Sequence, residues 1–432
     1  MKTVILGAGL SGLECGRQLR LKGRDFKILE KEGQIGGLAK TNVSGGYRWD
    51  FGVHALYSRD PRMTDYLHSL PLDYVPAERR VSIYHTDLKS RRYLINYPFE
   101  EGIKGLPFKD RLECVCGYLM AKIRNQSEFR NLQDWIDHCL GFGIAKHFMT
   151  PYNRKIWNCD LRQISMGLVN AKIHPASLKK FLMAALGKEV IGRMYQWRFI
   201  YPKNGIQALM DYTAQGLESR IVLNKDVREL ARDSSGWRIT TRDGVTEQAD
   251  TVISTIPLVE LLKMITVEGL ERRYPQLKWN DTYFIMVGLK EGASFSLLND
   301  CHWAFFKEEE SFFRITMMHN FSPCFSPALV AEITDKTGRG GLLPETLRGR
   351  VVEDLIRLGI LKCRDDVALT DMKRAAYTYP IPTVDADPVK DMVTRRLERL
   401  GLYLVGRNGH WDYLNMDGIL SSVSSFMQRY FA

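Results

Sequence analysis

The hydrophobic pattern at the start of the chain predicts a strand, a helix and a second strand. The apolar run at residues 4–6 is short and uninterrupted, which is typical of a strand buried in a parallel sheet. Between residues 13 and 19, small and apolar side chains recur at helical spacing. The sequence FKILE at residues 26–30 then predicts the next strand. A strand–helix–strand order of this kind indicates an α/β fold.

Two later stretches return to the pattern of a buried strand. The first, ADTVISTIP at residues 249–257, follows an Asp243-Gly244 pair, which is a strong signal for a hairpin. The second, LYLVG at residues 402–406, leads into a stretch at 416–431 whose apolar side chains recur at i, i+4 and i+8. That spacing predicts an amphipathic helix at the C-terminal end.

The stretches between these strands have a different character. Residues 131–153 have helical spacing, whereas TYFIMVGLK and ALVAEIT predict strands and PETLRGRVVEDLIRLGI predicts a helix. A chain of 432 residues is also too long for one compact core. We therefore expect an α/β fold with a dinucleotide-binding domain built from residues 1–62, 200–260 and 396–432, and an interleaved α+β substrate domain built from residues 63–199 and 261–395.

The composition and charge of the chain indicate which kinds of partner it can bind. Apolar residues make up 45% of the chain and charged residues 26%, an ordinary balance for a globular protein. The formal net charge is +11, which favours an acidic partner such as a phosphorylated ligand, an anionic membrane surface or a nucleic acid. No nucleic-acid-binding motif accompanies the charge, so we expect no nucleic acid partner. No apolar run approaches the ~18 residues of a transmembrane segment.

The cysteines and histidines predict neither disulfides nor a metal site. Eight cysteines are scattered along the chain without zinc-ligand spacing, which is typical of reduced thiols in a cytoplasmic protein. His147 stands alone in an apolar stretch, and such a histidine is expected to be packed rather than to bind a metal.

The first turn of the chain carries the strongest chemical signal. Gly7, Gly9 and Gly12 fit the pattern G-x-G-x-x-G between the first strand and the first helix. The first glycine permits the tight turn, the second lets a pyrophosphate approach the backbone, and the third lets the helix pack close to the strand. Glu30 ends the second strand, where its carboxylate can accept hydrogen bonds from ribose hydroxyls. These residues together predict a dinucleotide-binding site.

A second glycine pair, Gly36-Gly37, follows this acid, and the stretch DFGVH ends at His54. Here the chain resembles the flavoprotein group that contains amine oxidases, protoporphyrinogen oxidases and UDP-galactopyranose mutases. The resemblance implies FAD as the cofactor and a Rossmann-like FAD-binding domain of the GR2 type. In this first part of the chain and in the strand that begins at Val227, it implies the following cofactor contacts: Gly7, Gly9, Leu10, Ser11, Gly12, Glu30, Lys31, Gly37, Leu38, Lys40, His54 and Val227.

The stretch GRNGHWDYLNMDGIL at residues 406–420 gains a role from the same resemblance. In this flavoprotein group the last strand, turn and helix close under the isoalloxazine ring, and the helix N-terminus points its partial positive charge at the flavin. The resemblance implies that Gly406 and Arg407 contact the cofactor. It also places Asn415 and Met416 at the pyrimidine edge of the flavin.

Several short motifs resemble UDP-galactopyranose mutases in particular. Tyr413 matches the tyrosine of their GR…Y…MD pattern, although Asn415 stands where those enzymes have an acid. PYNRKIW and INYPF match segments of their substrate pocket, and His54 matches the histidine of their loop over the flavin. The resemblance implies catalytic roles for His54, Arg407 and Tyr413. It implies the following substrate contacts: Asn96, Tyr97, Tyr152, Asn153, Trp157 and Tyr413.

The chain departs from the mutase pattern at two arginines that clamp the substrate diphosphate. One should follow Trp157 by roughly a dozen residues and the other should precede the strand near TYFIMVGLK, and neither is present. Basic residues near the first position are possible substitutes: Arg154, Arg162, Lys172, Arg193 and Arg198. Parts of the chain also look closer to protoporphyrinogen-oxidase-like proteins.

Three functions remain open on the sequence. The first is a mutase-like enzyme acting on a nucleoside-diphosphate sugar, in which N5 of the reduced flavin attacks the anomeric carbon during a pyranose/furanose-type rearrangement. The second is an oxidase or dehydrogenase of the protoporphyrinogen oxidase or amine oxidase type, which passes a hydride from substrate to flavin N5. The third is a partner subunit that holds FAD as a structural element.

Overall fold

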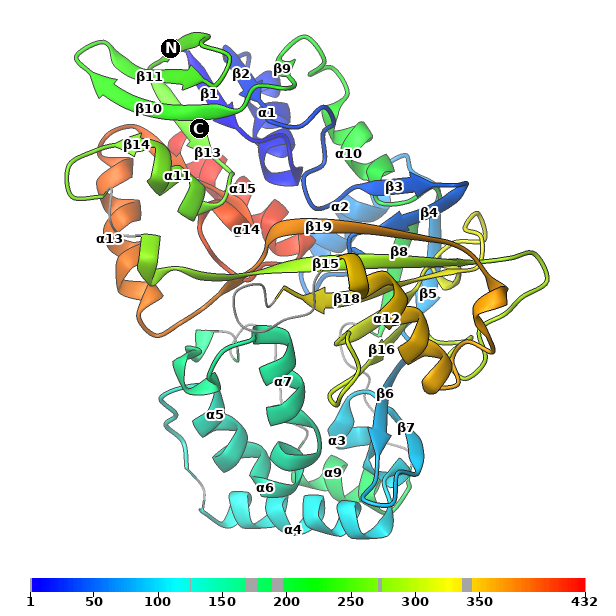
Figure 1. Ribbon diagram of the computed structural model, residues 1–432. Helices are drawn as coiled ribbons and strands as arrows, with labels where there is room; N and C mark the ends of the chain where they lie inside the picture. The colour runs from blue at the N-terminus through cyan, green and yellow to red at the C-terminus, as the bar shows by residue number, and fades with distance from the viewer. Residues whose placement is uncertain are drawn as a thin grey trace.

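The computed structural model describes residues 2–124, 126–167, 169, 177–188, 197–270, 274–335 and 344–431. Its N- and C-terminal segments meet in a five-stranded parallel sheet with the order β20–β13–β1–β2–β9. Figure 1 shows these segments together in the upper part of the molecule. The five strands are β1 (Thr3–Leu6), β2 (Phe26–Leu29), β9 (Ile221–Val222), β13 (Thr251–Ser254) and β20 (Leu402–Leu404).

Two helices pack together beside this sheet. Helix α1 (Leu10–Leu21) joins β1 to β2, and its small and apolar face is buried, as its spacing predicted. Helix α15 (Met416–Tyr430) contacts α1 and buries the apolar stripe predicted from its sequence. The predicted strands and helices at both ends of the chain are therefore confirmed. All five strands of the sheet come from the three segments that the sequence assigned to dinucleotide binding.

A four-stranded sheet with the order β12–β11–β10–β14 lies next to the parallel sheet. The Asp243-Gly244 pair turns the chain between β11 and β12, and Gly244 has a φ of +85°, which explains the glycine. The four strands are β10 (Val227–Asp233), β11 (Gly236–Thr241), β12 (Thr246–Ala249) and β14 (Ile265–Thr266).

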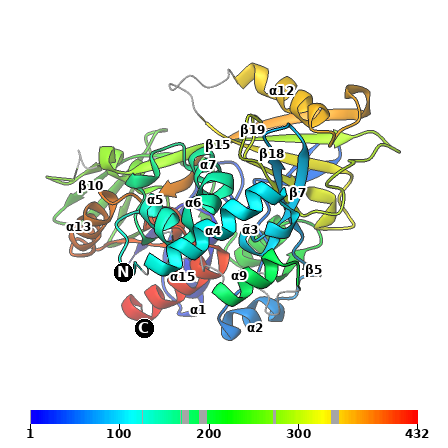
Figure 2. The same cartoon turned by 90° about the horizontal axis from the view of Figure 1, so that it is seen from below.

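A seven-stranded sheet with the order β19–β15–β18–β17–β16–β6–β7 spans the middle of the molecule. Its long strands β15 and β19 pair in antiparallel fashion. Helix α12 (Pro344–Arg357) packs on one face of the sheet, and helices α3 to α9 lie on the other side in Figure 2. The strands are β6 (Val81–Thr86), β7 (Arg92–Asn96), β15 (Lys278–Leu289), β16 (Trp303–Phe305), β17 (Arg314–Met317), β18 (Ala328–Thr334) and β19 (Val367–Ile381).

The helical character predicted for residues 131–153 is confirmed. The stretch consists of short helices joined by π-helical turns. Gly141 has a φ of +81°, and a Cβ there would lie 2.1 Å from the carbonyl oxygen of Gly117, so the chain bends where it touches α4. The helical elements are α3 (Phe99–Gly102), α4 (Phe108–Arg124), α5 (Leu132–Trp135), η2 (Ile136–Leu140), α6 (Gly141–Ile144), η3 (Ala145–Met149), α7 (Thr150–Trp157) and α9 (Leu178–Ala185).

His147 is buried, as expected for a packed histidine. Its Nε2 atom lies 2.8 Å from Oε2 of Glu113 on α4, because the turn η3 carries the imidazole to the inner face of that helix.

In the described part of the chain, no helix has both the length and the apolar character needed to cross a bilayer.

The remaining elements complete the fold around the sheets. They are β3 (Thr41–Ser44), β4 (Tyr47–Asp50), α2 (Pro61–Ser69), β5 (Tyr74–Glu78), β8 (Arg198–Pro202), α10 (Gln207–Ala214), α11 (Leu258–Met264), α13 (Ala386–Glu398) and α14 (Gly406–Gly409).

Candidate active site

A cavity of about 1110 Å³ lies between the parallel sheet, strand β19 and the helical layer. The carboxyl ends of β1, β2 and β13 open into it, as ligand sites do in parallel sheets. Its far wall is formed by Tyr152 and Trp157 of α7. Small-molecule sites usually occupy ~300–1,000 Å³, so this cavity has room for a cofactor and a substrate together.

The glycine turn has the geometry that a pyrophosphate needs. Gly7 has a φ of +95°, and a Cβ on Gly12 would lie 1.9 Å from the Gly7 carbonyl oxygen. Helix α1 therefore rests directly on the turn. No side chain caps its N-terminus at Gly9, so its first N–H groups face the cavity without a side-chain acceptor. Such a helix terminus favours an anionic group, and the residues present fit FAD.

Most of the predicted cofactor residues line this cavity. Gly12 and Gly406 lie behind it instead: Gly12 supports the turn, and a Cβ on Gly406 would lie 2.0 Å from Oγ of Ser11. The Glu30 carboxylate is buried at the wall, where it accepts hydrogen bonds from the backbone N–H groups of Ala8 and Glu32. The predicted cofactor residues that line the cavity are Gly7, Gly9, Leu10, Ser11, Glu30, Lys31, Gly37, Leu38, Lys40, His54, Val227, Arg407, Asn415 and Met416.

The end of the chain forms another wall of the cavity. Helix α15 begins at Met416, and the Asn415 side chain makes no capping hydrogen bond to it. Both residues line the cavity, so the positive end of the helix dipole faces the cavity.

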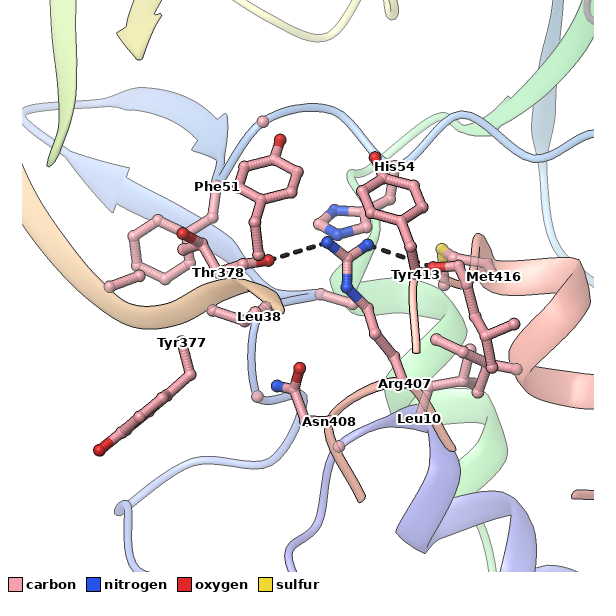
Figure 3. Close-up of a pocket in the computed structure, with 18 of the residues that line it drawn as sticks. Leu10, Leu38, Phe51, His54, Tyr377, Thr378, Arg407, Asn408, Tyr413 and Met416 are labelled. Carbon is pink, nitrogen blue, oxygen red and sulfur yellow. Dashed lines mark hydrogen bonds between the residues drawn. The ribbon is translucent and has the colours of Figure 1, made fainter. Parts of the chain in front are cut away.

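Arg407 lies at the centre of the site (Figure 3). Its Nη1 donates to the carbonyl oxygen of Leu414 at 3.1 Å, and its Nη2 donates to that of Thr378 at 2.8 Å. The guanidinium carbon lies 4.6 Å from the ring centre of Tyr413 and 5.2 Å from that of Tyr379. The buried Nε–H has no hydrogen-bond partner among the described residues, so it is available to a ligand oxygen.

A bulge in β19 supplies one of these acceptors. Residues 376–378 of β19 lie opposite the single residue Asp281 of β15, and Tyr377 has a φ of +55°. Bulges often re-aim backbone groups beside active sites. Here the bulge lies in the part of β19 that presents Thr378 to Arg407.

His54 lies beside Arg407 in Figure 3. Burial, together with the positive charges of Arg407 and Arg314, lowers the pKa of His54 to about 4. The imidazole is therefore neutral near pH 7, and its buried Nδ1 has no partner in the described structure. A neutral ring of this kind can donate or accept a hydrogen bond in the cavity without adding charge.

Arg314 is a site residue that the sequence reasoning missed. It lies on β17 and lines the cavity, where its Nε and Nη2 donate to the two carboxylate oxygens of Glu332 at 2.6 Å each. Its Nη2 also lies 3.2 Å from the hydroxyl of Tyr379. A signal was present, because both members of the pair interrupt otherwise apolar strands. Only the strand register shows that they face each other.

The aromatic wall contains most of the predicted substrate residues. Trp157 contacts Tyr379 and Tyr413 edge to face, with ring centres 6.1 Å apart in each case. Asn153 accepts a hydrogen bond from the Trp157 indole at 3.1 Å and donates one to the Met149 carbonyl at 2.7 Å. Its amide therefore fixes the tryptophan ring.

Tyr152 and Tyr97 also line the cavity, whereas Asn96 does not. Tyr152 stacks on Phe148 with ring centres 4.9 Å apart. Asn96 is exposed at the end of β7, because the alternation of side chains along the strand turns it away from the buried Ile95.

Three of the five basic residues considered in place of the missing mutase arginines do not line the cavity. Arg154, Arg162 and Arg198 are exposed, and Lys172 and Arg193 lie outside the described residues. The exposed three lie on local helices or at a strand end, so their sequence distance from Trp157 was a poor guide to their position. Nine other basic side chains line the cavity: Lys31, Lys40, Arg79, Lys225, Arg242, Arg314, Lys373, Arg374 and Arg407.

The family model for the flavin containing amine oxidoreductases matches residues 10–282, more than half of the 432 residues. The chain belongs to this family. FAD is therefore its cofactor.

Two curated relatives illustrate the sequence similarity within this family. AofH of Mycobacterium tuberculosis, named as a flavin-containing monoamine oxidase, is 23% identical over 300 residues. The mitochondrial protoporphyrinogen oxidase of Nicotiana tabacum is 22% identical over 304 residues. The matches cover 63% and 61% of this chain, and 61% and 59% of the relatives, so the chain spans about three fifths of their lengths.

Solved structures show the same fold over the whole chain. Reduced UDP-galactopyranose mutase superposes with a TM-score of 0.90 at 22% identity, covering 100% of this chain and 96% of that one. Putrescine oxidase bound to putrescine superposes with a TM-score of 0.67 at 14% identity, covering 99% of both chains. At these identities the similarity establishes the fold.

Proposed function

We propose that this flavoprotein acts on a nucleoside-diphosphate sugar and catalyses a mutase-like rearrangement of the sugar ring. The observation that carries the proposal is that Arg314 and Arg407 both reach the cavity beside the aromatic wall of Trp157 and Tyr413. Two guanidinium groups suit a diphosphate, and neighbouring aromatic rings suit a nucleobase. The segments 1–62, 200–260 and 396–432 would form the FAD-binding unit, and the two between them the substrate unit.

The charge of the cavity supports an anionic substrate as well as an anionic cofactor. Nine basic and five acidic side chains line it, and Lys225, Arg314 and Arg374 also pair with acids behind the lining. Lys40, Lys373 and Arg407 form no ion pair with a carboxylate in the described part of the chain, so their charges remain for anionic ligands. FAD phosphates would use the groups near the glycine turn. Arg314, Arg407 and Lys373, on β17, α14 and β19, would serve the substrate. The five acidic residues are Glu30, Glu32, Glu100, Asp226 and Glu260.

Each side chain then has a physical role in the reaction. Arg407 and Arg314 would stabilise the negative charge that develops as the diphosphate leaves the anomeric carbon. Trp157, held by Asn153, would orient the base and so position the sugar. The neutral imidazole of His54 would hydrogen-bond near the reacting centre. When bound and reduced, FAD supplies the nucleophilic N5 atom that this class of rearrangement requires.

Asn415 favours a substrate different from that of the UDP-galactopyranose mutases. It replaces the acid of the mutase motif and lines the cavity at the start of α15. An amide there can donate as well as accept hydrogen bonds and adds no negative charge near the diphosphate. The similarity to UDP-galactopyranose mutase over the whole chain supports this reaction class.

A second candidate function is oxidation of a small amine or a related donor by hydride transfer to flavin N5. It is favoured by the names of the sequence relatives, a monoamine oxidase and a protoporphyrinogen oxidase. The rings of Tyr379 and Tyr413 differ in plane by 12° with centres 6.0 Å apart, and the Arg407 guanidinium already lies against both. In this reaction the two rings would therefore offer the donor apolar surface.

One experiment separates the two reactions. The protein is reduced with dithionite under anaerobic conditions and incubated with a panel of uridine-, thymidine- and guanosine-diphosphate sugars, and the products are analysed by chromatography. A mutase forms an isomeric product only when the flavin is reduced and consumes no oxygen. The proposal is wrong if no sugar is converted while aerobic incubation with amines consumes oxygen.

The free cysteines suggest where the protein works. None of the eight forms a disulfide in the described structure, and Cys116 and Cys324 are exposed. Exposed free thiols are typical of a reducing compartment, and we propose a cytoplasmic location.

A further inference from the structure

A buried cluster of histidine and acidic side chains lies outside the cavity, on the inner face of α4. His85 comes from β6, Asp110 and Glu113 come from successive turns of α4, and His147 comes from the π-helical turn η3. His85, Asp110 and His147 are exposed by only 2%, 5% and 8%. No residue of this cluster has a part in the proposed flavin chemistry.

The cluster has the spacing of a metal coordination shell. His85 Nε2 lies 2.9 Å from Asp110 Oδ2, and His147 Nε2 lies 2.8 Å from Glu113 Oε2 and 3.9 Å from Asp110 Oδ1. One ligand atom from each of His85, Asp110 and His147 falls within 4.8 Å of the others. Neighbouring ligands of a tetrahedral zinc ion lie roughly 3.3 Å apart, given bonds of ~2.0–2.1 Å. Small side-chain rotations would open the shell to that size.

The charges around the cluster favour a bound cation. The two carboxylates are matched by one close lysine, Lys146, whose Nζ lies 2.6 Å from Glu113 Oε2. That lysine side chain is 58% exposed, so it can turn to solvent when a metal takes its place. Lys307, near His85, already pairs with Glu308.

We propose that His85, Asp110, His147 and Glu113 form a structural site for a divalent transition metal of the zinc class. Two imidazoles and two carboxylates match the nitrogen and oxygen donors of tetrahedral sites. The imidazoles select against magnesium and calcium, which prefer oxygen ligands alone. The metal joins the strand β6, the helix α4 and the turn η3, which are distant in sequence.

The site would stabilise one wall of the active cavity. Phe148 and Met149 follow His147 directly and line that cavity, and Tyr152 stacks on Phe148. A metal that fixes the π-helical turn therefore fixes the position of the aromatic wall. Its role is structural, because none of its ligands lines the cavity.

The test measures metal directly and does not depend on activity. The flavin-loaded protein, purified without chelator, is analysed by plasma mass spectrometry, and about one transition-metal ion per chain is expected. Chelator treatment should lower Tm, and added Zn²⁺ should restore it. In His147→Gln and His85→Gln, glutamine keeps a hydrogen-bond donor for the carboxylate but is a poor metal ligand. Both variants should lose the metal and the response to Zn²⁺.

His138→Gln is the matched control. His138 also contacts a carboxylate, with its Nδ1 3.0 Å from Asp134 Oδ1, but its side chain is 34% exposed. Among the described residues it belongs to no group with metal-ligand spacing. This variant should keep the metal and the Zn²⁺ response of the wild type. The proposal is overturned if chelated wild-type protein binds no Zn²⁺, Co²⁺ or Mn²⁺ and its Tm does not change. It is equally overturned if the His147→Gln and His85→Gln proteins bind as much metal as the control.

Discussion

Arg314 and Glu332 face each other on the adjacent strands β17 and β18, joined by two hydrogen bonds of 2.6 Å. Glu332 has no exposed surface, whereas the Arg314 side chain is partly exposed at the cavity. The pair therefore holds a guanidinium at the cavity from a fully buried support. Gly52 passes close to both side chains: a Cβ there would lie 3.0 Å from Arg314 Nη2.

Removing the arginine should cost stability and nucleotide binding together. Arg314→Met leaves the buried Glu332 carboxylate without its cation, and breaking such a pair costs about 3–5 kcal/mol of unfolding free energy. Loss of the guanidinium should also weaken binding of UDP to the FAD-loaded protein. Chemical denaturation and calorimetric titration with UDP measure the two effects.

The double variant Arg314→Met/Glu332→Leu separates the loss of stability from the loss of UDP binding. It removes both charges, so most of the stability should return, while UDP binding should remain weak. If the double variant binds UDP as tightly as the wild type, Arg314 has no part in holding a diphosphate.

Gly12→Ala should abolish FAD binding. The new Cβ would lie 1.9 Å from the backbone oxygen of Gly7, so α1 must move away from the pyrophosphate turn. The matched control is Gly349→Ala in the helix α12, where a Cβ meets no atom within 4 Å. That change should raise stability by up to about 1 kcal/mol and leave the flavin in place. Absorbance of the purified proteins near the flavin bands reports the outcome, and a fully yellow Gly12→Ala protein would contradict the assignment of the turn.

The aromatic wall should contribute stacking energy to nucleotide binding. Trp157→Ala is expected to weaken UDP binding by roughly 1–3 kcal/mol, the range for stacking of a base on an aromatic side chain. Trp157→Phe keeps an aromatic face and should recover part of this loss. Calorimetric titration measures both, with the flavin spectrum as a check on folding. Equal UDP affinities for the alanine variant and the wild type would move the base-binding site elsewhere.

Asp50 should make stability depend on pH in an unusual direction. Burial raises its pKa to about 7, although Tyr201 and Thr41 donate hydrogen bonds to it. At pH values between the unfolded pKa of ~3.9 and the folded pKa, Asp50 is protonated in the native state and ionised in the unfolded state. The contribution of Asp50 is therefore fully present below the unfolded pKa and is lost as pH rises toward and through 7.

The comparison with Asp50→Asn isolates this effect. The variant does not titrate there, so its stability relative to the wild type should increase as pH rises from 5 to 8. Urea unfolding at fixed FAD concentration measures the difference at each pH. A constant difference across this range would show that Asp50 titrates with an ordinary pKa.

The sequence alone determined the parts of the site that are built locally. The turn of Gly7, Gly9 and Gly12 is specified by backbone conformation and by contact between neighbouring segments, and these demands appear as glycines at fixed spacing. The terminal helix α15 was equally visible, because its buried stripe repeats every turn. From these local features followed the α/β class, and the family resemblance that they carry implied FAD and a place for Arg407 in the site.

The tertiary structure decided everything that depends on pairing between distant elements. Arg314 meets Glu332 only because β17 and β18 align in one register, and His85 meets Asp110 only because β6 packs on α4. The bend at Gly141 likewise depends on the neighbouring Gly117, not on local propensity. The sequence around a residue indicates the chemistry of its side chain and the face of the helix or strand on which that side chain lies. Which partner it meets depends on how that element packs against others far along the chain.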